Sequence, residues 1–400
     1  MIATTNPLSI FDGYESPKPF RIHVAQADLD DLHERLARTR WPHSIPDFED
    51  ATDFSRGVPL GYWQDLAEYW RGDFDWRAQE RALNAHEQFT MDVDGQTFHV
   101  LHARSLVPGA KPLLLNHGWP ASFVEYTRII NSLVDPCAHG GDEADAFHVV
   151  IPSPPGFGFS TPLVSTGWEV ARTSSAYAEI LTRLGYERFA THGTDTGAGV
   201  SLRLGATLPE RVIGVHVGSD GRALAMVGNK YPYPDDFSPE DIAEVERVRR
   251  SDAGERGYFE VQNHHPATIG AALTDSPVGQ LAWIVEKFQT WTGGPHSTPD
   301  EVVDRDQLLT NVSLYWFTRA GASSAQFYYE AEHSQLDWLA PTGVPTGWAV
   351  FDTHPLMRRA MDPWNAVDHW SEFALGGHFP AMEQPDLLVG DLRAFFRGRT

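Results

Sequence analysis

One stretch of the sequence, FATHGTDTG at residues 189–197, contains the pattern of a strand, a tight turn and the start of a helix. Its first residues are apolar or β-branched, as in a buried strand, and Gly193 and Gly197 flank the turn. Glycines permit the strained backbone of a nucleophile elbow, which lifts one side chain out of a sheet and places it at a helix N-terminus. Here that side chain is the carboxylate of Asp195, which the helix dipole keeps ionised. A carboxylate in this place predicts attack on an sp³ carbon with formation of an alkyl ester, although a helix N-cap is the plainer interpretation of the same residue.

The alternation of strands and helices continues on both sides of this turn. Short apolar runs and helical stretches occur at residues 113–115, 149–151, 168–184, 212–217, 348–351, 369–373 and 386–396. Such alternation predicts an α/β fold with a mostly parallel sheet that helices cover on both faces. In sheets of this kind the functional site forms at the carboxyl ends of the strands.

The sequence pattern predicts four segments. The N-terminal residues are rich in tryptophan and have apolar side chains at helical spacing, and a long region before the last two strands is irregular and mostly helical. We therefore expect an N-terminal helical domain, a first part of the sheet domain, a helical lid inserted into it, and a second part of the sheet domain. Their predicted bounds are residues 1–95, 96–222, 223–340 and 341–400.

The composition excludes several classes of protein. The 400 residues include 31 Lys and Arg and 54 Asp and Glu, which gives a net charge of −23. A chain this negative repels phosphate backbones and anionic lipids, so we expect neither a nucleic acid nor a membrane as a partner. A single cysteine, Cys137, excludes an intrachain disulfide and a cysteine-based zinc site. Because we see no apolar run of about 20 residues and no secretory signal, we expect a cytoplasmic protein.

Two further motifs lie where the predicted strands end. His117-Gly118-Trp119-Pro120 follows one strand, and its turn could aim the Trp119 N–H at the same point as the Thr196 N–H. Two such donors form an oxyanion hole, and a simple strand exit is the alternative interpretation. Gly376-Gly377-His378-Phe379 follows the last predicted strand, and the small residues before His378 let its imidazole approach a neighbour. His378 also comes late in the chain, as the catalytic base does in α/β-hydrolases.

Two tyrosines of the predicted lid, Tyr258 and Tyr328, are candidates for binding a substrate oxygen. A phenol has a pKa near 10, so it can donate a hydrogen bond to an oxygen that becomes negative. A tyrosine taken alone is more often a structural residue, and the chain has 12 of them.

Taken together, these motifs resemble an epoxide hydrolase of the microsomal type over nearly the whole chain, from about Pro19 to Arg397. Each motif is short, but their joint order and spacing are specific. The matching stretches are Thr39-Arg40-Trp41-Pro42, Gly57-Val58-Pro59, Tyr69-Trp70, Asp75-Trp76-Arg77, Leu83-Asn84, His117-Gly118-Trp119-Pro120, Pro155-Gly156-Phe157-Gly158-Phe159-Ser160, residues 193–197, Gly257-Tyr258, Ser323-Ser324-Ala325-Gln326-Phe327-Tyr328 and Gly376-Gly377-His378-Phe379.

The resemblance implies an α/β-hydrolase core with a helical lid and an N-terminal helical domain that wraps the core. It implies conversion of a small apolar epoxide and water into a vicinal diol, with no metal and no organic cofactor. By position, Asp195 matches the nucleophile of the family, and His378 matches its base. Tyr258 and Tyr328 match the two lid tyrosines that hold the epoxide oxygen. Trp119 and Thr196 fall where the backbone donors of the oxyanion hole are expected, and a homodimer stays open.

One position departs from the family pattern. The charge-relay acid is expected three residues after the phenylalanine that ends the late strand, and counting from Phe351 gives His354. A histidine supplies no negative charge to an imidazolium, so we expect a nearby carboxylate to replace it. Asp352 stands two residues earlier on the same face of the strand, and Asp220 stands just past residues 212–217. We favour Asp352 over Asp220.

Three other functions stay open at the level of sequence. A haloalkane dehalogenase uses the same nucleophile and base, but the paired lid tyrosines favour an epoxide. A ligand-binding protein on a degenerate hydrolase fold gains some support from His354 at the acid position. A serine hydrolase is disfavoured because the elbow has no serine.

Overall fold

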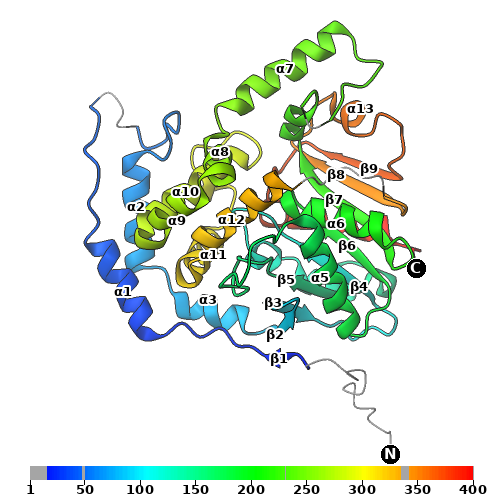
Figure 1. The fold of residues 1–400 in the computed structure, drawn as a ribbon, viewed down its shortest axis with the longest axis horizontal. Helices are drawn as coiled ribbons and strands as arrows, with labels where there is room; N and C mark the ends of the chain where they lie inside the picture. The colour runs from blue at the N-terminus through cyan, green and yellow to red at the C-terminus, as the bar shows by residue number, and fades with distance from the viewer. Residues whose placement is uncertain (1–15, 47–49, 230, 335–341, 400) are drawn as a thin grey trace, which may run out of the picture.

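The computed structural model describes residues 16–46, 50–229, 231–334 and 342–399. Within these ranges the sheet has the strand order β1-β2-β3-β5-β4-β6-β7-β8-β9 (Figure 1). The strands are β1 (Lys18–Pro19), β2 (Glu87–Val93), β3 (Gln96–Ala103), β4 (Lys111–Asn116), β5 (Phe147–Pro152), β6 (Phe189–Gly193), β7 (Val212–Asp220), β8 (Thr346–Phe351) and β9 (His369–Phe373). The pairs from β1 to β5 in this order are antiparallel, and the pairs from β5 to β9 are parallel. The prediction of a mostly parallel sheet is confirmed.

Helices cover both faces of this sheet. On β7, Gly214 faces the Phe395 ring of α15 (Pro385–Phe396), whereas the next residue, Val215, packs against Gly205 of α6 (Asp195–Thr207). Because successive residues of a strand point to opposite faces, α6 and α15 lie on opposite sides of the sheet. Helix α5 (Val170–Arg183) packs beside α6 in front of the sheet in Figure 1.

The chain between β7 and β8 contains the helices of the region predicted to be a lid, and we call these helices the lid. Its helices are α7 (Pro239–Ala253), α8 (Gly257–His264), α9 (Pro266–Asp275), α10 (Pro277–Trp291), α11 (Arg305–Thr318) and α12 (Ala320–His333). Two side chains of α11 fix the lid to the loop after β4: the Asn311 amide donates to the Pro120 carbonyl (2.7 Å), and the Tyr315 hydroxyl donates to the Ala121 carbonyl (2.8 Å). Residue 230 and residues 335–340 of the predicted lid lie outside the described residues.

The N-terminal helices α1 (Gln26–Ala37), α2 (Leu60–Gly72) and α3 (Trp76–Leu83) pack against the lid helices α10 and α11. The indole N–H of Trp63 donates to the Val278 carbonyl (3.0 Å), and the indole N–H of Trp70 donates to the Ser313 hydroxyl (2.9 Å). Strands β1 and β2 are part of the core sheet, so the sheet begins before the boundary predicted at residue 95. Residues 1–15 and 47–49 of the predicted N-terminal domain lie outside the described residues.

Short helices complete the architecture. They are α4 (Ile130–Val134), α13 (Met357–Met361), α14 (Pro380–Glu383) and the 3-10 turns η2 (Phe123–Tyr126), η3 (Pro136–His139), η4 (Glu143–Asp145), η5 (Gly221–Met226) and η6 (Pro299–Glu301). Of the helices in the described ranges, none combines the length and the apolar character that a membrane crossing requires.

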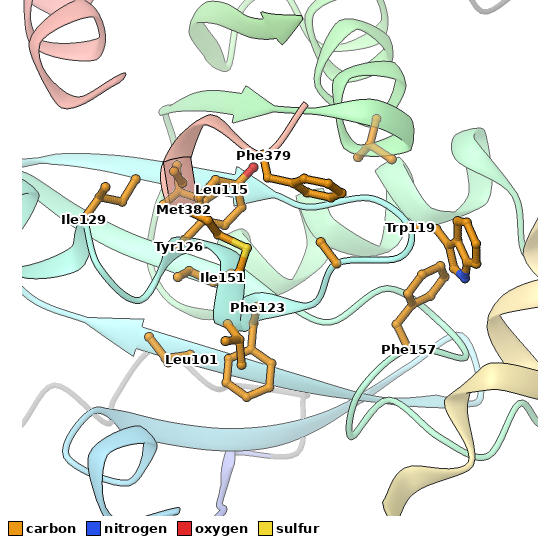
Figure 2. Close-up of a cluster of buried hydrophobic side chains, with 14 of the residues drawn as sticks. Leu101, Leu115, Trp119, Phe123, Tyr126, Ile129, Ile151, Phe157, Phe379 and Met382 are labelled. Atoms are coloured by element: carbon orange, nitrogen blue, oxygen red, sulfur yellow. The ribbon is translucent and has the colours of Figure 1, made fainter. Parts of the chain in front are cut away.

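The hydrophobic core continues from the sheet into the lid. Leu101 on β3 and Ile151 on β5 lie within the buried cluster of Figure 2, and Trp119 and Phe157 lie at its end nearest the lid. The Phe157 ring contacts Phe327 of α12 (6.0 Å between ring centroids), and the Trp119 ring contacts other aromatic rings of the lid. These shared contacts hold the lid over the carboxyl ends of the parallel strands.

Candidate active site

The predicted tight turn between strand and helix is present between β6 and α6. Asp195 is the first residue of α6 and has a φ of +51°, in the left-handed region that side chains other than glycine rarely adopt. Gly197 packs so tightly that a Cβ atom there would lie 2.0 Å from the Asn116 carbonyl oxygen. Strain of this kind persists at functional sites when the surrounding structure enforces it. The turn lifts the Asp195 side chain above the end of β6.

Backbone N–H groups hold one side of the Asp195 carboxylate. The Trp119 N–H donates to Asp195 Oδ1 (3.1 Å), and the Thr196 N–H also hydrogen-bonds this carboxylate. A Cβ at Gly118 would lie 2.2 Å from Oδ1, which explains the glycine in that motif. Burial raises the pKa of Asp195, but the attraction of His378 and the two N–H groups outweigh burial, so the pKa lies below its usual value.

His378 lies between two carboxylates. Its Nδ1 is 3.0 Å from Asp220 Oδ2, and its Nε2 is 3.6 Å from Asp195 Oδ2. The His378 backbone N–H donates to the Trp291 carbonyl (2.9 Å), and the Trp291 ring lies 4.8 Å from the imidazole. Burial lowers the pKa of His378, but the two carboxylates outweigh burial and raise that pKa to about 9. The free protein therefore holds an imidazolium at this position near neutral pH.

The structure places Asp220, and not the favoured Asp352, beside His378. Asp220 ends β7, and its side chain is 8% exposed. Asp352 follows the last residue of β8, where a φ of +43° turns the chain away from the strand and leaves the residue exposed. The expectation that Asp352 keeps the alternation of its strand is therefore wrong. His354 does not contact His378 either, because its Nε2 is 2.9 Å from Glu244 Oε1 of α7.

Two tyrosines of the lid stand opposite Asp195. Tyr258 of α8 stacks on the Trp119 indole (4.9 Å between centroids, 6° between planes), and Tyr328 of α12 meets the same indole edge-on (5.9 Å). The Tyr328 hydroxyl is buried and interacts with the Tyr258 phenol. Burial, together with the negative charge of Asp195, raises the pKa of both phenols, so both hydroxyls stay protonated and can donate.

These side chains line one cavity of about 560 Å³ beneath the lid. Its wall includes Asp195, His378 and both tyrosines, and apolar side chains such as Leu202, Met226 and Phe259 extend it away from the carboxylate. Within the described residues, no group of three His, Cys, Asp or Glu side chains is arranged to hold a metal ion. The cavity can therefore bring a small apolar molecule to a carboxylate, an imidazole and two hydroxyls.

Two family models match the chain: Epoxide hydrolase N terminus at residues 17–126 and alpha/beta hydrolase fold at residues 111–239. A candidate epoxide hydrolase of Stigmatella aurantiaca is 42% identical over 95% of this chain and 84% of its own length. Epoxide hydrolase 1 of Oryctolagus cuniculus is 32% identical over 98% of this chain and 90% of its own length. The chain belongs to the epoxide hydrolase family.

Solved structures of epoxide hydrolases have the same fold. The Aspergillus niger epoxide hydrolase is 26% identical and covers 97% of both chains with a TM-score of 0.81. The juvenile hormone epoxide hydrolase of Bombyx mori is 28% identical, with the same TM-score, over 96% of this chain and 95% of its own. This member of the epoxide hydrolase family is thus a hydrolase with the α/β-hydrolase fold, as the sequence predicted.

Several residues around the site of this family member were not predicted from the sequence. Arg222 and Trp291 line the cavity, and the buried Glu383 accepts the backbone N–H groups of Phe379 (2.9 Å) and Gly293 (2.8 Å), which fixes the loop of His378. Glu125 is buried and accepts the Thr194 hydroxyl at the elbow (3.2 Å), and burial raises its pKa to about 8. Glu125 belongs to the loop after His117-Gly118-Trp119-Pro120, which was the only sequence signal near it.

Proposed function

We propose that this protein hydrolyses an apolar epoxide to a vicinal diol through an ester on Asp195. The observation behind this proposal is the arrangement in one cavity of a backbone-held carboxylate, an imidazole 3.6 Å from it, and two lid tyrosines, of which Tyr328 is buried and Tyr258 is partly buried. A carboxylate nucleophile suits attack on an sp³ carbon, and hydroxyl donors suit an oxygen that becomes negative. No serine stands at the elbow.

In the first step, Asp195 Oδ2 attacks one ring carbon while Tyr258 and Tyr328 donate hydrogen bonds to the ring oxygen. The carbon–oxygen bond of the ring breaks, and one tyrosine transfers a proton to the new alkoxide. Asp195 Oδ1, which accepts the Trp119 N–H, becomes the carbonyl oxygen of the ester. Esterification removes one of the two negative charges beside His378, so the pKa of His378 falls and the imidazolium releases a proton. This proton returns to the tyrosine that protonated the ring oxygen, so the tyrosine is again a neutral phenol.

In the second step, neutral His378 takes a proton from water, and the resulting hydroxide attacks the carbonyl carbon of Asp195. Negative charge develops on Oδ1, where the backbone N–H groups of Trp119 and Thr196 stabilise it. The tetrahedral intermediate then expels the diol oxygen, which takes the proton from His378. The Asp195 carboxyl group that remains transfers its proton to His378, which restores the carboxylate and the imidazolium of the free protein. Asp220 holds Nδ1 of His378 and stabilises the imidazolium during these transfers.

An assay of diol formation tests the proposed function. We expect the protein to convert an aryl epoxide such as styrene oxide to its diol, and to release no halide from an alkyl bromide of similar size. Halide release in place of diol formation would indicate a dehalogenase. A ligand-binding protein on this fold would bind the epoxide and leave it unchanged over repeated turnovers.

Removal of either lid hydroxyl should slow formation of the ester. Hydrogen bonds to charged groups contribute about 1.5–3 kcal/mol, so Tyr258→Phe and Tyr328→Phe should each slow alkylation by about 10- to 150-fold. Hydrolysis of the ester should change much less. Pre-steady-state measurement of both steps provides the test, and normal alkylation in both single variants would remove the tyrosines from the mechanism. Tyr329→Phe is a matched control, because Tyr329 is exposed beside Tyr328 on α12.

Neutralisation of the acid beside His378 should slow the second step. Asp220→Asn keeps the shape of the side chain but removes the charge that stabilises the imidazolium, so we expect ester hydrolysis to fall by about 100-fold or more. Asp352→Asn is the matched control and should leave both steps unchanged, because Asp352 is exposed. Single-turnover kinetics provide the measurement. The assignment of Asp220 fails if Asp352→Asn gives the larger loss.

The cellular location and the oligomeric state remain predictions from the sequence. A cytoplasmic location can be checked by fractionation of cells that express the protein. A homodimer can be checked by analytical ultracentrifugation of the full chain.

A further inference from the structure

Arg222 makes most of the hydrogen bonds to Asp220, the proposed acid of the charge relay. It lies in η5, two residues after Asp220. Its backbone N–H and its Nε donate to Asp220 Oδ1 (2.9 and 3.1 Å), and its Nη2 donates to Oδ2 (2.9 Å). His378 Nδ1 is the remaining partner of Oδ2. Arg222 thus supplies three of the four contacts to this carboxylate, in the fork geometry that guanidinium groups form with carboxylates.

The position of Arg222 ties this contact to the reaction site. Its guanidinium lies 5.1 Å from the centroid of the Trp291 ring, and that ring also contacts the His378 imidazole. The residue also lines the cavity that contains Asp195. A guanidinium that only fixed a loop would not need to share a carboxylate oxygen with the imidazole of the base.

We propose that Arg222 is a positioning residue that aligns Asp220 with His378 and limits how strongly Asp220 holds the imidazolium. This inference rests on the proposed function, because it concerns the hydrolysis of the Asp195 ester. A carboxylate that shares its charge with a guanidinium attracts the imidazolium less than a free carboxylate does. Arg222 therefore favours the neutral imidazole that must take a proton from water.

The other charged groups around His378 and Arg222 should not mask the influence of Arg222 on the protonation of His378. Besides Asp220, the groups that interact with His378 are Asp195 on α6, Glu125 on η2 and Glu383 on α14. Asp252 on α7 interacts with Asp220 and Arg222 and with Lys287 on α10. Burial raises the pKa of Glu125 to about 8, so Glu125 does not add a full negative charge near neutral pH. Burial also raises the pKa of Glu383, whose carboxylate accepts the backbone N–H groups of Phe379 and Gly293. Lys287 is paired with Glu286 (2.6 Å). Once Asp195 is esterified, Asp220 is the carboxylate in direct contact with the imidazole, and Arg222 is its cationic partner.

Removal of the Arg222 guanidinium should shift the pH dependence of ester hydrolysis to higher pH. Ester hydrolysis needs neutral His378, so its rate rises with pH through the pKa of His378 in the ester and then reaches a plateau. Loss of the guanidinium leaves Asp220 with its full charge, which stabilises the imidazolium and moves this rise to higher pH by roughly one unit. Near neutral pH the ester should then hydrolyse up to about tenfold more slowly, because less imidazole is neutral.

The test compares ester decay in Arg222→Met and Arg222→Lys with the unsubstituted protein. A single turnover of styrene oxide is quenched at intervals between about pH 6 and pH 10, and the ester is followed by intact mass. In Arg222→Met the pH at which the rate of ester hydrolysis increases should be higher than in the unsubstituted protein. In Arg222→Lys this pH should not change, because the positive charge remains. The maximal rate of ester hydrolysis at high pH should fall, because lysine cannot form the bidentate contact with the carboxylate. Arg359→Met is the control: Arg359 pairs with Asp236 and Asp241 outside the cavity, so neither the rise nor the plateau should change.

The inference would be overturned if the pH at which ester hydrolysis speeds up did not change in Arg222→Met, or if it changed equally in both variants. A lower maximal rate of ester hydrolysis, with no change in the pH at which the rate increases in either variant, would show that Arg222 has a purely structural role. If Arg222→Met does not fold, Arg222→Gln provides the same loss of charge with a polar side chain. Failure of the proposed function is distinguishable from these results, because the unsubstituted protein would then form no ester.

Discussion

Alanine in place of Asp195 is expected to reduce diol formation by about 10⁴-fold or more, to the limit of detection. The substitution removes the only atoms proposed to bond with the substrate carbon, and water bound in the cavity is a much weaker nucleophile. No ester should form, so intact mass should show no adduct on the variant. Steady-state diol formation and mass spectrometry of the quenched reaction provide the measurements.

The fold should survive this substitution. Asp195 occupies a strained position at φ +51°, and alanine there costs about 1–2 kcal/mol, which is small beside the stability of a large α/β domain. Thermal unfolding close to that of the unsubstituted protein would show that the loss of activity is chemical. Substantial diol formation by a folded Asp195→Ala protein would exclude Asp195 as the nucleophile.

Glutamine in place of His378 is expected to trap the ester. The first step needs Asp195 ionised but does not need a base, and the backbone N–H groups of Trp119 and Thr196 still stabilise the carboxylate. The second step loses its general base, so ester hydrolysis should slow by about 10²- to 10⁴-fold. A single adduct of one epoxide per chain should accumulate within the first turnover, and fragmentation should locate it on Asp195.

The matched control is His33→Gln, since His33 is exposed on α1 and far along the chain from the site. This variant should turn over normally and accumulate no adduct. If His378→Gln forms no adduct but hydrolyses the epoxide slowly, then the imidazole takes part in the first step. The proposal that His378 acts as a base only in the second step would then be wrong.

The parts of the site that lie close together in the sequence were predictable. The turn around Asp195 was visible because strand, glycines and helix start are contiguous, and the structure has each of them. Tyr258 and Tyr328 are 70 residues apart, and only the resemblance to a family indicated that both belong to one site. The structure brings both onto the Trp119 indole.

The carboxylate beside His378 could not be predicted because its contact with the imidazole depends on tertiary structure. Periodicity placed Asp352 on the correct face of an extended strand, but the strand ends at Phe351 and the next residue turns. Asp220 is paired with Phe351 in the register of β7 and β8, so both candidates lie at the same edge of the sheet. Asp220 contacts His378, whereas Asp352 has a positive φ and is exposed. Likewise, helical spacing in the N-terminal segment predicted α1 and α2 but not that they pack against the lid.

A single turnover in ¹⁸O-labelled water, with enzyme in excess over styrene oxide, tests the covalent mechanism most directly. Hydroxide from water attacks the carbonyl carbon of the Asp195 ester, and the diol leaves with an oxygen that belonged to Asp195. We therefore predict that one heavy oxygen appears in the peptide that contains Asp195 and none in the first diol released. Heavy oxygen in that first diol, with none in the peptide, would show that water attacks the epoxide itself and would contradict the ester on Asp195.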